Sequence, residues 1–130
     1  MRLLLDTHAL AWWWIEDKRL PSAARAAIAD PDNTVLVSAA TAWELATRQR
    51  LGKWPDVAAI VDDLDALLRR SRFGALVITL AHARRAGTLD GPRRDPFDRM
   101  LIAQCRQEDL PIVFGDPVFA QYGVRVIWRA

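Results

Sequence analysis

Acidic residues stand at positions from which a folded chain could bring them together. Five of them lie at predicted strand ends or in the first turns of predicted helices: Asp6, Glu44, Asp95, Asp98 and Asp116. Carboxylates that approach one another closely repel, so such a cluster requires a bound cation or shifted pKa values. Oxygen ligands in a chain with two histidines and one cysteine suit Mg²⁺ or Mn²⁺. These ions bind phosphate oxygens and activate water, so the pattern predicts metal-dependent hydrolysis of a phosphodiester.

Each of these acids also has a purely structural interpretation. Asp6 can cap the helix that follows it, and Glu44 forms with Thr41 the Thr-x-x-Glu pattern of a capping box. Acids at a helix start, such as Asp95 and Asp98, are favoured by the helix dipole alone. The acid after the fourth strand precedes a proline and can be a turn residue. The joint placement of the five, rather than any single position, favours a site.

The sequence predicts a parallel sheet that would position these acids. Short apolar or β-branched runs predict strands at residues 2–5, 34–37, 75–78, 112–114 and 124–128. Helical patterns and caps separate them, at residues 7–15, 21–29, 40–50, 56–72, 80–87 and from residue 96 onward. This alternation predicts the α/β class, as a three-layer α/β/α sandwich with a central, mostly parallel sheet of about four to five strands. Ligands of such sheets bind beyond the carboxyl ends of the strands, where the acids fall.

Composition narrows the class of protein. The chain has 130 residues, of which 52% are hydrophobic, and we expect one domain over residues 1–130. The formal net charge of +2 disfavours a protein that holds nucleic acid by bulk charge alone. Cys105 is the single cysteine and no zinc-ligand spacing occurs, so we expect a reducing, cytoplasmic setting. Asp6 and His8 interrupt the apolar start, so neither a membrane span nor a signal peptide is expected.

Four short segments follow one another along essentially the whole chain. They are residues 4–10 (LLDTHAL), 38–44 (SAATAWE), 95–104 (DPFDRMLIAQ) and 114–117 (FGDP). In this order they resemble PIN-domain nucleases of the VapC toxin type. The resemblance implies a Mg²⁺- or Mn²⁺-dependent ribonuclease that is the toxin of a bacterial toxin–antitoxin pair. It also implies a homodimer that a small cognate antitoxin protein inhibits.

The resemblance gives roles to individual acids. Asp6, Glu44 and Asp98 match the three central acids of the family, and a fourth acid of the family matches Asp116. Asp6 and Asp98 would hold one metal ion. Asp116 and Glu44 would ligate through water or complete a second site. Asp95 lies one helical turn before Asp98 on the same helix face and is a candidate additional acid.

Two hydroxyl residues lie beside these acids. Thr7 matches the small polar residue next to the first acid, and Ser38 matches the hydroxyl after the second strand. Three roles remain open for each: contact with metal, a hydrogen bond that holds an acid, or a helix cap.

Cations and aromatic residues near the predicted site have two interpretations each. An RNA backbone in an acidic cleft needs compensating cations, which Arg93, Arg94 and Arg99 could supply as phosphate contacts, although a solvated loop explains them equally well. Consecutive helix positions cannot share one surface, so the tryptophans at 12–14 are expected to pack against neighbours rather than to stack on nucleobases. His8 is expected to be a helix residue near the site rather than a base.

Two other functions compete with the ribonuclease. A Mg²⁺-dependent phosphatase also places an aspartate at a strand end, but it commonly needs a positioned lysine, and neither Lys18 nor Lys53 ends a predicted strand. A non-catalytic PIN-like module that binds RNA or protein would lack some of the acids. All of the acids are present, so the ribonuclease is favoured.

Overall fold

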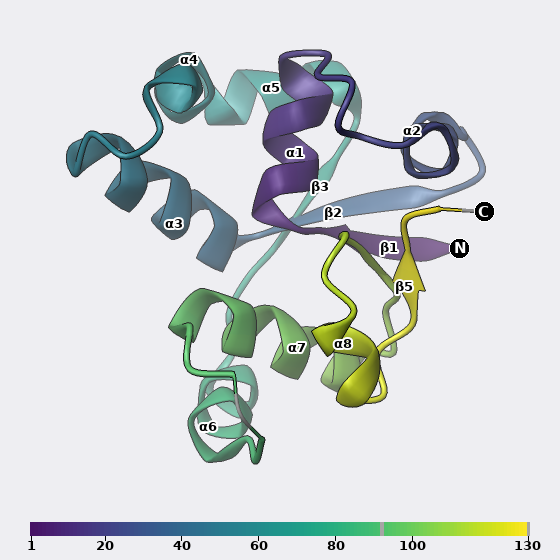
Figure 1. Ribbon diagram of the computed structural model, residues 1–130, viewed down its shortest axis with the longest axis vertical. Coiled ribbons are helices and arrows are strands. Elements are labelled where there is room, and N and C mark those ends of the chain that lie inside the picture. Colours follow the sequence, from purple (N-terminus) through teal and green to yellow (C-terminus); the bar gives the residue numbers. More distant parts are fainter. Residues whose placement is uncertain (92, 130) are drawn as a thin grey trace.

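A parallel five-stranded sheet forms the centre of the computed structural model, which describes residues 1–91 and 93–129 (Figure 1). The strands are β1 (Arg2–Leu5), β2 (Thr34–Ser38), β3 (Gly74–Leu76), β4 (Ile112–Val113) and β5 (Val126–Ile127). They lie in the order β3-β2-β1-β4-β5, and each neighbouring pair is parallel. The predicted α/β/α sandwich with a central parallel sheet is confirmed.

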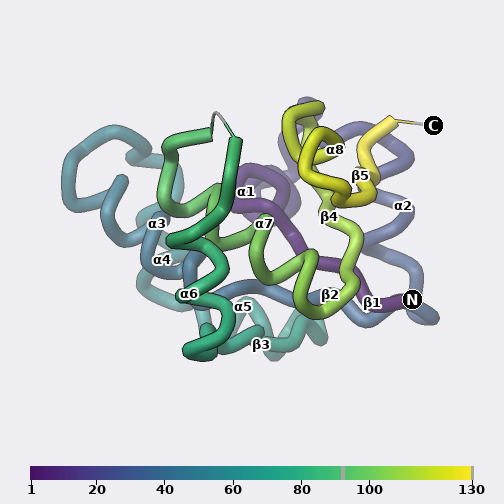
Figure 2. Tube along the Cα trace, turned by 90° about the horizontal axis from the view of Figure 1, so that it is seen from below, coloured from purple at the N-terminus to yellow at the C-terminus, as the bar shows by residue number. Residues whose placement is uncertain are grey.

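Helices cover both faces of this sheet. They are α1 (Thr7–Trp14), α2 (Ser22–Ala29), α3 (Ala39–Arg50), η1 (Pro55–Val57), α4 (Ala58–Asp62), α5 (Leu64–Ser71), α6 (Leu80–Thr88), α7 (Pro96–Glu108) and α8 (Val118–Gln121). In Figure 1, α1, α4 and α5 lie above the sheet, whereas α6, α7 and α8 lie below it. Figure 2 shows the molecule from below, with α6 and α7 in front of the strands. Within the described residues, none of these helices combines the length and apolar character that a bilayer crossing requires.

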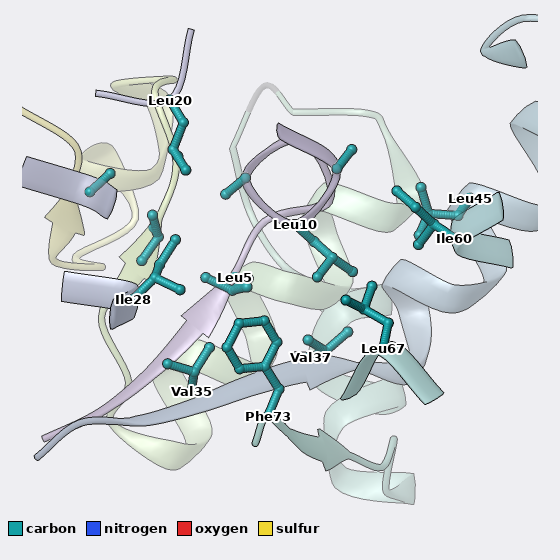
Figure 3. Packing of buried hydrophobic residues seen from close by; sticks show 14 of the residues in the cluster. Leu5, Leu10, Leu20, Ile28, Val35, Val37, Leu45, Ile60, Leu67 and Phe73 are labelled. Carbon is teal, nitrogen blue, oxygen red and sulfur yellow. The ribbon is translucent and has the colours of Figure 1, made fainter. Parts of the chain in front are cut away.

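The alternation of side chains along the strands divides the core between the two faces. Leu3 and Leu5 of β1 belong to one cluster of buried residues and Leu4 belongs to the other. In Figure 3, Leu5 and Val37 of the sheet face Leu10 of α1 within the first cluster. Burial of each such leucine stabilises the fold by about 2 kcal/mol. The strands are therefore apolar on both sides, as expected of a parallel sheet between two helical layers.

Several elements differ from the predicted ones. The expected helix over residues 56–72 is interrupted at Asp63 (φ −120°, ψ 27°), because aspartate has a low propensity for the interior of a helix. The third strand ends at Leu76, and Val77 is 68% exposed, since β3 is an edge strand that leaves the sheet there. The fifth strand is shorter than predicted. The sequence does not predict helix α8, because four residues are too few to show a helical period.

The connectivity places a topological switch point beyond the carboxyl ends of β1 and β4, and we call the region around it the crevice. Strand β1 pairs with β2 on one side and with β4 on the other, so the strand order reverses between β1 and β4. Such a switch point is where open parallel sheets bind ligands. Asp6 directly follows β1, and Asp116 follows β4 in the same crevice. The topology therefore brings the two predicted acids to neighbouring strand ends.

Candidate active site

Asp6 is held rigidly at the start of α1. Its side chain is the N-cap of this helix, and Oδ2 accepts hydrogen bonds from the backbone N of His8 at 2.9 Å and of Ala9 at 3.4 Å. The residue is only 2% exposed. Its capping role and its place at the switch point are compatible, because a carboxylate has lone pairs left after two such bonds. Asp6 thus faces the crevice in one fixed orientation.

Glu44 reaches the same region from α3 and is held by two partners. The Thr7 hydroxyl donates to Glu44 Oε1 at 2.6 Å. Arg48, one turn further along α3, donates from Nε to Glu44 Oε2 at 3.0 Å, and its Nη2 lies 3.0 Å from the same oxygen in an ion pair. The residue that caps α3 is Ser38, so the pair formed by Glu44 and Thr41 is not a capping box here. Thr7 therefore positions an acid, and Glu44 is 4% exposed.

Asp95 and Asp98 begin α7 and have different surroundings. Asp95 is the N-cap, and its Oδ1 accepts from the backbone N of Phe97 at 2.8 Å and of Asp98 at 3.2 Å. Burial, together with the negative charges of Asp95 and Asp6, raises the pKa of Asp98 to about 7. Asp98 is therefore a carboxylate whose ionised form is disfavoured by its neighbours.

Arg93 joins Asp98 to Asp116 across the crevice. Its Nη1 lies 3.5 Å from Asp98 Oδ2, and its Nη2 donates to Asp116 Oδ2. The backbone N of Arg93 donates to the Tyr122 hydroxyl at 3.1 Å, which holds the backbone at this residue. Asp116 also accepts from the backbone N of Val118 at 2.9 Å. One cation thus already neutralises part of this acidic region.

The other two arginines of the predicted phosphate contacts have different positions. Arg99 donates from Nε to the Ala86 carbonyl at 3.1 Å, from Nη1 to the Arg93 carbonyl at 2.9 Å and from Nη2 to the Leu89 carbonyl at 2.6 Å. Its guanidinium therefore holds the loop before α7 and has little capacity left for phosphate. Arg94 is exposed on the same loop.

The donor set can be tested against a divalent metal ion. Within residues 1–91 and 93–129, no three acidic, histidine or cysteine side chains are arranged closely enough to hold a metal ion. The chemistry of the donors nevertheless fits a hard cation, because they are carboxylate oxygens that destabilise one another's charge at Asp98. Arg93 now compensates that charge in part. A divalent cation would compensate the negative charge of these carboxylates more fully than Arg93 does.

Ser38 belongs to a different polar network. Its hydroxyl donates to Gln104 Oε1 at 2.6 Å, while Gln104 Nε2 lies 3.3 Å from the Val77 carbonyl and 3.4 Å from His82 Nδ1. His82 forms a capping box with Thr79 at the start of α6. Sequence reasoning missed this buried network. The Thr-x-x-His spacing before α6 and a glutamine within an apolar helix were the available signals.

His8 and the three tryptophans belong to α1 and contact different neighbours. His8 Nδ1 is 3.6 Å from Asp6 Oδ2, and the side-chain hydrogen bond with Asp6 raises the pKa of His8. The tryptophans point to different neighbours: Trp13 lies against Phe73, and Trp14 lies under Arg70. All three pack against the core of this face, which confirms the predicted packing.

Comparisons with known proteins agree with this architecture. The family model described as PIN domain matches residues 3–124. A crystal structure of VapBC2 from Rickettsia felis bound to a promoter DNA fragment has a TM-score of 0.65 at 14% identity, with 97% of each chain covered. A crystal structure of VapC20 from Mycobacterium tuberculosis, a sarcin–ricin loop cleaving toxin, has a TM-score of 0.64 at 19% identity, with 94% of this chain and 95% of that chain covered.

No curated protein sequence matches the chain. The identities to the two solved structures are low, so these structures establish the fold alone. The family model, by contrast, covers most of the sequence, from within the first strand to just before the last. On this evidence the chain belongs to the PIN domain family.

Proposed function

We propose that the chain is a divalent-metal-dependent endoribonuclease and the toxin of a toxin–antitoxin pair. The observation that carries this proposal is the electrostatic state of Asp98. Burial, the charge of Asp95 at the start of the same helix and the charge of Asp6 after β1 raise its pKa to about 7. Strongly shifted carboxylates in a crevice mark functional sites, since the fold gains no stability from such repulsion.

The proposed metal ligands are four of the five acids that the sequence singled out. Asp6 and Asp98 would hold the cation, and Glu44 and Asp116 would ligate through water or complete a second site. Asp95 acts as a positioning residue, since it caps α7 and orients the start of the helix that carries Asp98. A bound divalent cation would supply Lewis acidity at the phosphate and a water of lowered pKa.

The residues around the acids have separate tasks. Thr7 and Arg48 hold the two oxygens of Glu44, and the first turn of α1 fixes Asp6. Arg93 pairs with carboxylates in the free chain, and we propose that it turns to a phosphate of bound RNA once a cation neutralises those acids. Arg94, exposed on the same loop, would bind a neighbouring phosphate.

The proposal that the chain is a toxin draws on the comparisons. One structurally similar chain is a toxin that cleaves the sarcin–ricin loop, and the other comes from a VapBC2 structure. Together with the PIN domain match, this supports RNA as substrate and a cognate antitoxin protein as partner. We expect the free chain to act as a homodimer in the cytoplasm.

A cleavage assay with the purified chain tests the activity. Labelled RNA is incubated with Mg²⁺, with Mn²⁺ or with EDTA, and new RNA ends are mapped. We expect cleavage that requires the metal and is lost in Asp6→Asn and in Asp98→Asn. Asp65→Asn on α5 is the matched control, because this exposed acid lies outside the crevice. Full metal-dependent activity of a folded double variant, Asp6→Asn/Asp98→Asn, would refute the proposal.

A further inference from the structure

A groove of about 650 Å³ opens directly beside the acidic crevice. Aromatic side chains from three segments line it: His8, Trp12, Phe114 and Trp128. Asp116 lies on its wall, so the groove reaches one of the acids that follow the strands. We call this feature the aromatic groove. No role assigned so far to the acids or to the arginines of the loop explains it.

The rings of the aromatic groove form a connected surface. Trp12 of α1 lies 5.9 Å from Trp128, which follows β5, at an interplanar angle of 44°. One turn before Trp12, His8 lies 5.7 Å from it and is stacked on Phe114 at 6.3 Å and 13°. These rings are partly exposed rather than fully buried. They therefore present part of their apolar surface to the groove.

Glycine at position 115 allows Trp128 to reach the groove. A Cβ atom at Gly115 would lie 2.8 Å from both Cε2 and Nε1 of the Trp128 indole. Any side chain at this position would therefore push the ring aside. Gly115 immediately precedes Asp116, so the indole packs against the backbone that carries a proposed metal ligand. The groove and the acidic crevice are built on the same turn.

Cations surround the aromatic faces. Lys18, Arg19 and Arg129 line the groove, and the guanidinium carbon of Arg19 lies 4.8 Å from the Trp12 ring centroid. Asp17 holds Arg19 in place, with Nε 3.1 Å from Oδ1 and Nη2 2.7 Å from Oδ2. The groove thus combines flat apolar surface with fixed positive charge. This is the complement of a chain that alternates bases and phosphates.

We propose that the aromatic groove binds one nucleobase of a single-stranded RNA, whose neighbouring phosphate lies at the acidic crevice. The base stacks on the Trp128 indole, and Lys18, Arg19 and Arg129 bind the flanking phosphates. Every base has a π face, so such a site tolerates many sequences while it fixes the strand beside the acids. The inference rests on the proposed ribonuclease function and names how its substrate is held.

Binding of RNA to the metal-free chain tests the groove without cleavage. Fluorescence anisotropy measures the Kd of a short fluorescein-labelled single-stranded RNA in EDTA. We expect Trp128→Ala to raise the Kd roughly tenfold, within the range of one lost stacking contact. Trp14→Ala is the matched control, since Trp14 lies on the same helix as Trp12 but faces Arg70. Its Kd should equal that of the wild type, provided that circular dichroism and thermal unfolding show both variants folded.

A crosslinking experiment keeps the test valid if Trp128→Ala does not fold. RNA that contains 5-iodouridine is irradiated with the unmodified chain, and the attached peptides are identified by mass spectrometry. Crosslinks on Trp12, Phe114 or Trp128 support the proposal. Crosslinks confined to other residues overturn it.

The remaining outcomes separate the two proposals. If the wild type cleaves RNA through Asp98 but Trp128→Ala binds RNA with unchanged affinity, the groove proposal is wrong and the ribonuclease stands. If the wild type neither binds nor cleaves RNA, the ribonuclease proposal fails and the groove proposal fails with it. If Trp128→Ala loses a protein partner while its RNA affinity is unchanged, the groove is a protein-binding site instead.

Discussion

Helix α7 contributes to two groups of polar side chains, one neutral and one that consists mainly of carboxylates. Near its middle, Gln104 joins Ser38 and His82 in a buried network of neutral groups, in which the amide contacts a hydroxyl, a carbonyl and an imidazole. At its start, Asp98 faces other carboxylates, and its pKa is raised to about 7, mainly by burial. In the part of the chain that the structure describes, no buried side-chain nitrogen or oxygen lacks a hydrogen-bond partner. The two groups therefore differ in charge, since only the second holds carboxylates close to one another.

This contrast distinguishes a structural network from a candidate site. Hydrogen bonds among neutral buried groups fix how α7 packs against β2 and α6, and they cost nothing in charge burial. The acidic crevice lowers the stability of the metal-free fold, since like charges are held together. Such a cost persists where function requires it. The predictions below test this difference, beginning with the largest expected effect.

Loss of the carboxylate at position 98 should abolish the activity without harm to the fold. We expect Asp98→Asn to reduce RNA cleavage by about a hundredfold or more, because even residues that merely orient metal ligands contribute about 10- to 100-fold. The rate of cleavage of labelled RNA in Mg²⁺ measures this. A cleavage rate within about twofold of the wild type would show that Asp98 is a structural residue. The contrast between the acidic site and the neutral network would then be wrong.

Disruption of the neutral network should have the opposite pattern. Gln104→Leu leaves the Ser38 hydroxyl and the His82 imidazole without their amide partner, and we expect a loss of about 2–4 kcal/mol in the free energy of unfolding. Urea denaturation measures the loss. The specific activity of the folded fraction should remain unchanged. Unchanged stability would show that the hydrogen bonds of the network contribute little.

The stability of the metal-free chain should depend on pH through Asp98. Its pKa rises from 3.8 to about 7 on folding, so the folded state binds this proton more tightly than the unfolded state. Protonation of Asp98 therefore stabilises the fold. This stabilisation is complete below the pKa that Asp98 has in the unfolded state, and it is lost as the pH rises through the pKa of the folded state. In EDTA we therefore expect a lower Tm at about pH 8 than at about pH 5.

Asp98→Asn serves as the control for this pH dependence. The amide has no charge to lose or gain, so its Tm in EDTA should fall less between the two pH values and should exceed that of the wild type at the higher one. Equal pH profiles of the two proteins would show that the crevice imposes no electrostatic cost at this residue.

The smallest expected effect concerns the arginines of the loop before α7. The double variant Arg93→Ala/Arg94→Ala should bind RNA more weakly, and the slope of log Kd against log salt should decrease by about 0.7 for each lost phosphate contact. Anisotropy over a range of salt concentrations measures the slope. Arg84→Ala/Arg85→Ala on α6 is the matched control. A slope equal to that of the wild type would leave Arg93 as a partner of Asp98 and Asp116 only.

The fold followed from local signals, whereas part of the site depended on tertiary contacts. Apolar runs that alternate with helical segments indicated the sheet, and strand ends indicated where Asp6 and Asp116 would lie. Nothing in the order of residues shows that Ser38 contacts Gln104, because these residues are 66 positions apart. The same limit applies to Arg99, whose partners are carbonyls of a loop and of α6. Sequence patterns specify the periodicity of an element but not which side chain its polar groups meet.

The hydrogen bonds of Arg99 also have a thermodynamic consequence for association. Its guanidinium bonds the carbonyls of Arg93 and Leu89, so the backbone beside the phosphate-binding candidates is already constrained in the free chain. Fixing a residue's backbone costs about 1–2 kcal/mol of conformational entropy. A ligand that met a disordered segment would have to offset that cost on binding. Here much of the cost is met during folding, so a larger share of each phosphate contact contributes to affinity.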